Sequence, residues 1–96
     1  MIGEFEQWLK SREQLFKNSG AVLSFKRRDA PTAAAVATLE SKSLVASITV
    51  WDTGACDVDT ISYETGESVL AQHYDVRSFE ELIPVLQEVV ALFVRQ

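Results

Sequence analysis

Residues 44–63, with the sequence LVASITVWDTGACDVDTISY, constrain the fold of this chain more than any other segment. The first half has one wholly apolar face, which consists of Leu44, Ala46, Ile48 and Val50. The opposite face is mixed and consists of Val45, Ser47, Thr49 and Trp51. A period of two is typical of a strand whose two faces meet different surroundings. After the turn 52–55, Asp57 and Asp59 share a face with Ile61 and Tyr63, so the segment predicts two strands joined by a tight turn.

Five strands are predicted in all, at Ala21–Arg27, Thr32–Glu40, Leu44–Asp52, Cys56–Tyr63 and Ser68–Tyr74. The second of these is ambiguous, because its alanines favour a helix by propensity. The short polar turn 41–43 that follows it is typical of a hairpin, so we interpret the segment as a strand, with a helix as the alternative. Turns recur about every ten residues, which indicates an antiparallel meander, since parallel strands need longer crossovers.

Two amphipathic helices are predicted at the ends of the chain. The first, Ile2–Lys17, has apolar residues at helical spacing, namely Ile2, Phe5, Leu9 and Phe16. In the second, Ser78–Val94, we expect Ser78 and Glu81 to form a capping box and Pro84 to bend the helix. Both helices must bury an apolar stripe. The fold is therefore predicted to be an α+β two-layer sandwich, in which an antiparallel meander sheet of four to five strands carries both helices on one face.

The charge balance limits the classes of partner. A single domain of 96 residues carries 14 acidic and 9 basic residues, with a net charge of −5. This balance argues against nucleic acid and anionic membranes, which are bound by clustered Lys and Arg. The one basic cluster, 26–28, is interpreted as a solvated strand end. An acidic surface suits a basic protein partner.

Cysteine usage and the absence of targeting signals predict a soluble protein of the cytoplasm. Cys56 is the only cysteine, so no disulfide forms within the chain and a reducing compartment is expected. The charged N-terminal segment lacks the apolar region of a signal peptide. No apolar run approaches the roughly 20 residues that span a bilayer.

No catalytic motif is recognisable in the sequence. We interpret Cys56 as a buried strand residue and His73 as a strand residue at the surface or edge of the sheet. One cysteine and one histidine are too few for a Cys/His metal site. The paired carboxylates of Asp57 and Asp59 are the only support for an enzyme. They fit either a solvated strand face or, beside the aromatic Trp51, a protein-binding surface.

The segment ITVWDTGACDVDTISYETGE, with His73-Tyr74 and Ser78–Leu82, resembles the TriTu family of bacterial immunity proteins. This resemblance implies that the chain protects its producer from a toxin domain of an Rhs-type polymorphic protein, delivered by a type VI secretion system. It implies that the toxin is an ADP-ribosyltransferase that uses NAD and modifies elongation factor Tu. It also implies that a tight 1:1 complex blocks the toxin's active site and that the immunity protein itself binds no cofactor.

We predict that the toxin is bound by aromatic and acidic residues on the open face of the sheet and its loops. These residues are Trp51, Asp52, Asp57, Asp59, Tyr63, Glu64 and Glu67. No catalytic residue, metal, nucleic acid, membrane or small-molecule substrate is expected. Two other functions are considered: a small acidic secretion chaperone that binds an extended segment of an effector, and an enzyme that removes ADP-ribose from the modified target.

Overall fold

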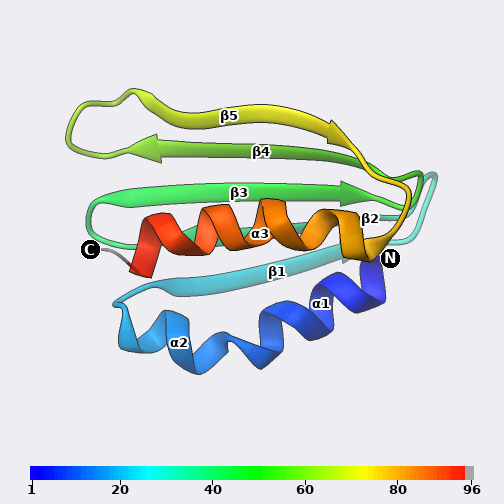
Figure 1. Ribbon diagram of the computed structural model, residues 1–96, viewed down its shortest axis with the longest axis horizontal. Coiled ribbons are helices and arrows are strands. Elements are labelled where there is room, and N and C mark those ends of the chain that lie inside the picture. The colour runs from blue at the N-terminus through cyan, green and yellow to red at the C-terminus, as the bar shows by residue number, and fades with distance from the viewer. Residues whose placement is uncertain (95–96) are drawn as a thin grey trace.

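Five antiparallel strands, in sequence order, form one sheet in the computed structural model of the protein, which describes residues 1–94 (Figure 1). They are β1 (Val22–Arg28), β2 (Ala34–Glu40), β3 (Leu44–Trp51), β4 (Ala55–Ser62) and β5 (Ser68–Asp75). The predicted meander is confirmed, and the ambiguous segment 32–40 is a strand rather than a helix. β2 pairs along its whole length with both β1 and β3, and this pairing outweighs the helix propensity of its alanines.

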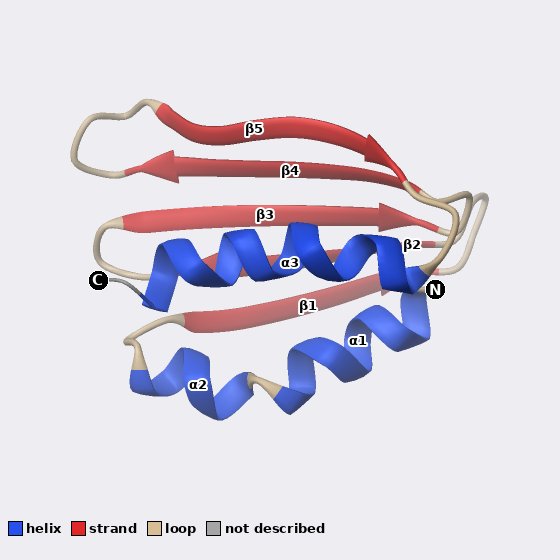
Figure 2. Cartoon of the chain, in the orientation of Figure 1, coloured by secondary structure: helices blue, strands red, loops and turns tan. Residues whose placement is uncertain are grey.

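Three helices cover one face of this sheet (Figure 2). α1 (Ile2–Ser11) and α2 (Glu13–Asn18) follow one another beside β1, and α3 (Phe79–Val94) lies over the middle of the sheet. The predicted two-layer α+β sandwich with its terminal helices on one face is therefore confirmed. Within residues 1–94, no helix lies on the opposite face of the sheet.

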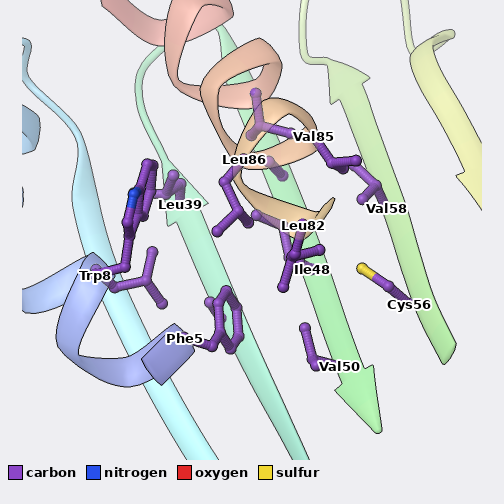
Figure 3. Close-up of a cluster of buried hydrophobic side chains, with 14 of the residues drawn as sticks. Phe5, Trp8, Leu39, Ile48, Val50, Cys56, Val58, Leu82, Val85 and Leu86 are labelled. Atoms are coloured by element: carbon purple, nitrogen blue, oxygen red, sulfur yellow. The ribbon is translucent and has the colours of Figure 1, made fainter. Parts of the chain in front are cut away.

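The hydrophobic core lies between the helices and the sheet (Figure 3). Leu82, Val85 and Leu86 of α3 project toward Ile48 of β3 and Val58 of β4. Two aromatic side chains of α1 extend this cluster, Phe5 and Trp8. None of these seven side chains is more than 8% exposed. Along β3, buried and half-buried residues alternate strictly, as the period of two in the sequence predicts.

The N-terminal helix is interrupted, so the prediction of one helix over 2–17 is wrong. Arg12 has φ −113° and ψ 9° and separates α1 from α2. The hydroxyl of Ser11 donates to the carbonyl oxygen of Trp8 at 2.6 Å, which competes with the regular helical bonding there. The Arg12 guanidinium lies 3.9 Å from the centroid of the Trp8 ring, so the break also places a cation over an aromatic face.

The start of α3 differs slightly from the predicted capping box. The Oε2 atom of Glu81 accepts a hydrogen bond from the backbone N–H of Arg77 at 2.9 Å, one residue before the expected partner Ser78. The carboxylate still satisfies a backbone donor and lies near the positive end of the helix dipole. Pro84 lies inside the helix, as predicted.

The turn between β3 and β4 depends on Gly54. Its φ is +97°, and its carbonyl oxygen accepts a hydrogen bond from the backbone N–H of Val76 at 2.9 Å. A Cβ atom at this position would overlap the carbonyl oxygen of Val76. Gly66, in the turn between β4 and β5, has a similar φ of +73°, but open space surrounds it.

We expect Gly54→Ala to lower the free energy of unfolding by about 2–5 kcal/mol. The left-handed backbone conformation costs about 1–2 kcal/mol for a residue with a Cβ, and the overlap with Val76 adds about 1–3 kcal/mol. Gly66→Ala is the matched control and should cost only the first of these amounts. Urea denaturation of both variants measures the difference, and equal losses would show that the contact with Val76 has no effect.

Candidate functional site: the open face of the sheet

The face of the sheet without helices, here called the open face, carries side chains from all five strands. Because side chains alternate along each strand, the pairing registers align them in rows across the sheet. One row crosses from β1 to β5 and consists of Lys26, Val36, Thr49, Asp57 and His73. The next row, nearer the β3–β4 turn, includes Arg28, Ala34 and Trp51. The rows bring together residues that are far apart in the sequence.

The β4–β5 side of the open face is acidic. Asp57 and Asp59 lie two residues apart on β4, and both are exposed, as their spacing predicts. The Oδ1 atom of Asp57 lies 2.6 Å from Nδ1 of His73, and the Oδ1 atom of Asp75 lies 3.1 Å from Nε2 of the same ring. We call these four residues, Asp57, Asp59, His73 and Asp75, the acidic pole.

His73 is exposed on β5, an edge strand, as predicted. The pKa of its imidazole is raised above the ordinary 6.5, first by the hydrogen bond to Asp57 and then by the hydrogen bond to Asp75. The protonated ring donates from both nitrogens and so links β4 to the end of β5. Protonation of His73 therefore makes the acidic pole one unit less negative and holds two of its carboxylates in place.

The opposite side of the open face is basic and hollowed. A depression of about 330 Å³, here called the basic hollow, is lined by Lys26, Arg27, Arg28, Ala34, Val36, Thr49 and Trp51. Arg27 alternates with Lys26 and Arg28 along the strand. Its guanidinium forms ion pairs with Glu6 at 4.0 Å and Asp29 at 3.3 Å. Within residues 1–94, Lys26 and Arg28 form no ion pair.

The seven residues predicted to contact a toxin fall into separate groups. Trp51, Asp57 and Asp59 lie together on the open face. Asp52 follows β3 in the turn toward β4, whereas the remaining three, Tyr63, Glu64 and Glu67, lie in the turn between β4 and β5. These turns are at opposite ends of β4, which has 8 residues and therefore spans about 25 Å. Asp57 and Asp59 are thus neighbours on β4, whereas Trp51 lies near Asp57 and about 13 Å along the strands from Asp59.

Tyr63 has a partner within the sheet. Its hydroxyl donates a short hydrogen bond to the carboxylate of Glu40, at the end of β2. This hydrogen bond, with a smaller effect from burial, raises the pKa of Tyr63 above its ordinary value of 10.0. Tyr63 is nevertheless 51% exposed, so its ring remains part of the surface at this end of the sheet.

Cys56 and His73, the possible nucleophile and base, are on opposite faces of the sheet. Cys56 is 0% exposed and faces the helices beside Val58, which confirms its predicted burial (Figure 3). Burial raises the pKa of its thiol to about 11, and the charge of Asp57 adds a smaller increase. This environment disfavours the thiolate that a nucleophilic cysteine needs.

The carboxylates around His73 do not form a cation site. Asp57 and Asp75 bond to different ring nitrogens and therefore approach opposite edges of the imidazole. Within residues 1–94, no group of three or more potential metal ligands converges. No helix in that part of the chain is long and apolar enough to cross a membrane.

The residues around Trp51 were not predicted from the sequence. Phe25 packs against the core, and side chains alternate between the two faces of a strand. This alternation places Lys26 and Arg28 on the open face. The alternation does not reveal that Ala34 and Val36 of β2 lie between these two cations and β3. That placement follows from the pairing registers.

One family of proteins matches this chain across its length. The family is described as "Immunity protein TriTu", and its sequence model matches residues 3–92. The match begins in α1, includes all five strands and ends within α3. It therefore extends the resemblance seen in the β3–β4 region to nearly the whole chain. A comparison with curated proteins found no match.

We expect the ring protons of His73 to titrate with a midpoint above pH 6.5 in an NMR experiment, because two carboxylates stabilise the protonated ring. Asp57→Asn should lower this midpoint. Asp59→Asn is the matched control, since it removes the same charge from the same strand face without contacting His73. Equal decreases in the two variants would show that the general negative field, rather than the hydrogen bond, raises the pKa.

The same pKa shift has a consequence for stability. Because the pKa is raised in the folded state, the His73 contacts stabilise the fold fully below about pH 6.5. Their contribution is lost as the pH rises through the raised pKa.

We expect Cys56 to resist iodoacetamide at pH 8 in the folded protein. With the pKa raised from 9.0 to about 11, its thiolate fraction is about 100-fold smaller than that of an ordinary cysteine, and its sulfur is buried. Mass spectrometry should show alkylation only after denaturation in urea. Rapid alkylation of the folded protein would contradict the burial of this side chain.

Proposed function

Because the chain belongs to the TriTu family of immunity proteins, we propose that it neutralises a cognate toxin domain by binding to it and covering its active site. In this proposal the toxin is an ADP-ribosyltransferase that uses NAD and modifies elongation factor Tu. It is carried by an Rhs-type polymorphic protein and delivered by a type VI secretion system. The immunity protein acts in the cytoplasm, where the toxin meets its target.

The open face is the observation that carries this proposal. It combines the aromatic Trp51 with the carboxylates of Asp57 and Asp59, and none of the helices formed by the described residues covers it. Aromatic residues are enriched at the centres of protein interfaces. An acidic surface also complements a cationic cleft that binds a phosphorylated cofactor such as NAD, and such complementarity accelerates association and selects the partner.

The dimensions of the open face suit a protein interface. Five strands spaced about 4.8 Å apart span about 19 Å, and their length is about 25 Å. Stable protein complexes bury about 800 Å² on each partner. The flat area of the sheet is about 500 Å² from these dimensions, and the protruding side chains and turns enlarge it. In the proposed 1:1 complex, the open face therefore reaches the area of a standard interface only together with its protruding side chains and turns.

This mechanism requires binding and no chemistry from the immunity protein. The chain contributes no cofactor, and the site on the open face acts by excluding NAD or the protein substrate from the toxin. The function as a secretion chaperone has less support, because the apolar stripe of α3 is occupied. Leu82, Leu86 and Val89 on that stripe are 0% exposed, so they are not free to hold an extended client segment.

We expect Asp57→Lys, Asp59→Lys and Trp51→Ala each to raise the Kd for the isolated toxin domain at least about tenfold, or about 1.4 kcal/mol. The first two place a cation against a cationic cleft, and the third removes an aromatic anchor. Isothermal titration calorimetry measures the affinity, and modification of elongation factor Tu in the presence of each variant measures inhibition. Glu13→Lys, on α2 in the other layer, is the control for the change in net charge.

Three results would count against the proposal at different levels. Unchanged affinity in all three folded variants would exclude these residues as the contact surface. A wild-type protein that forms a stable dimer and ignores the folded toxin domain in light scattering would contradict the immunity mechanism itself. Restoration of already modified elongation factor Tu by the purified protein would show that it acts as an enzyme.

A further inference from the structure

The open face is not uniformly acidic, although the whole chain is. Lys26 and Arg28 lie on β1, and the acidic pole begins on β4, three strands away (Figure 1), where Asp57 shares a row with Lys26. At about 4.8 Å per strand, Lys26 and Asp57 are about 14 Å apart. This separation exceeds the screening length of about 8 Å at physiological ionic strength. The two ends therefore present opposite charges to a partner rather than neutralising each other.

The cations at the basic hollow are available for an external partner. Within residues 1–94, Lys26 and Arg28 form no ion pair, whereas Arg27 between them contacts Glu6 and Asp29. Two exposed cations on one strand face repel each other and carry long side chains that hydrate freely. An anion that lies between these two cations is therefore bound favourably, because it offsets their repulsion and accepts their hydrogen bonds.

The shape of the basic hollow adds selectivity to this charge. Ala34 is the small residue between Arg28 on one side and Trp51 on the other, and it forms part of the floor of the hollow. Val36 and the ring of Trp51 supply apolar surface in the same depression. The hollow therefore suits a side chain that has an apolar methylene stem and an anionic end, because it offers both apolar surface and cations.

We propose that the basic hollow binds an aspartate or glutamate side chain of the toxin domain, with the carboxylate at Lys26 and Arg28 and the side-chain stem against Trp51. This inference rests on the proposed function and identifies a second contact of opposite sign on the same face. Arg28 offers the planar fork that pairs with a carboxylate through two hydrogen bonds. Lys26 adds a second charge from the neighbouring row.

A protein carboxylate fits this surface better than an extended polyanion. Asp57 lies about 14 Å from Lys26 and pairs directly with Thr49 at the edge of the hollow, so a nucleic acid strand lying across the open face would meet Asp57 and Asp59. The net charge of −5 opposes it further. A folded protein can place an anion at one end and a cation at the other. The charge pattern therefore fixes one orientation of the toxin, since the reversed orientation brings like charges together.

The carboxylate is detectable by zero-length carbodiimide cross-linking of the purified complex. The reagent joins the Nζ atom of Lys26 to a contacting Asp or Glu as an amide and takes up the released water itself as a urea. We expect mass spectrometry to identify a cross-linked peptide that contains Lys26. Lys17, on α2 in the layer of helices, serves as the internal control and should give none. Lys26→Arg should keep the affinity and lose the cross-link.

Charge reversal tests the same contact through affinity. Lys26→Glu and Arg28→Glu should each raise the Kd for the toxin domain about 10- to 100-fold, and high salt should reduce the difference from the wild type. Lys17→Glu, on exposed α2, changes the net charge equally and should alter the Kd less than about threefold. Circular dichroism confirms that each variant is folded.

The possible results separate this inference from the proposed function. If the wild-type protein neither binds nor inhibits the toxin domain, both fail. If the wild type binds but Lys26 forms no cross-link and both reversals leave the Kd unchanged, only the carboxylate contact is overturned. If Lys17→Glu weakens binding as much as the reversals on β1, the effect is one of net charge and the contact is again overturned.

Discussion

The packing of α3 against the middle of the sheet is the contact on which the rest of this structure depends. Leu82 and Leu86 are fully buried over the apolar side of β3 and β4, and each contributes about 1.5–3 kcal/mol by leaving water. A chain of 96 residues has enough apolar surface for one modest core. Because the helices use the apolar side of the strands, the other side must carry the polar and charged residues. The open face is therefore a consequence of the same contact that stabilises the fold.

The charges on that face are separated rather than paired. β1 contributes the cations, β4 and β5 contribute the carboxylates, and the two strands between them carry mainly small or uncharged side chains on this side. Arg27 shows the contrast, because it lies out of phase with Lys26 and Arg28 and approaches Glu6 of α1 at 4.0 Å. In this run of three basic residues, Arg27 therefore contacts the helix layer, whereas Lys26 and Arg28 lie on the open face. Under the proposed function, this charge pattern favours one orientation of the partner in addition to strengthening its binding.

Much of the fold was predictable, and the errors have identifiable causes. The strands, the meander and the positions of both terminal helices follow from apolar periodicity. The break at Arg12 was missed because the apolar spacing from Leu9 to Phe16 continues across it, while the Ser11 hydroxyl and the Trp8 ring disrupt the helix between them. The predicted toxin-binding set was correct in placing Asp57 and Asp59 on one face. It also includes Tyr63, Glu64 and Glu67, which follow β4 at the end of the sheet away from Trp51.

The sequence by itself determined which side chains share a face, because alternation along a strand and the helical repeat are local properties of the backbone. It assigned Asp57 and Asp59 to one side of β4 and Cys56 to the other. The same alternation along β1 places Lys26 and Arg28 on the side away from the core. Only the tertiary structure decided which residues are neighbours across strands. The registers that place Ala34 between Arg28 and Trp51, and His73 beside Asp57, arise from pairing between distant segments. A shift of one residue in any of them would change every such neighbour without altering the sequence pattern.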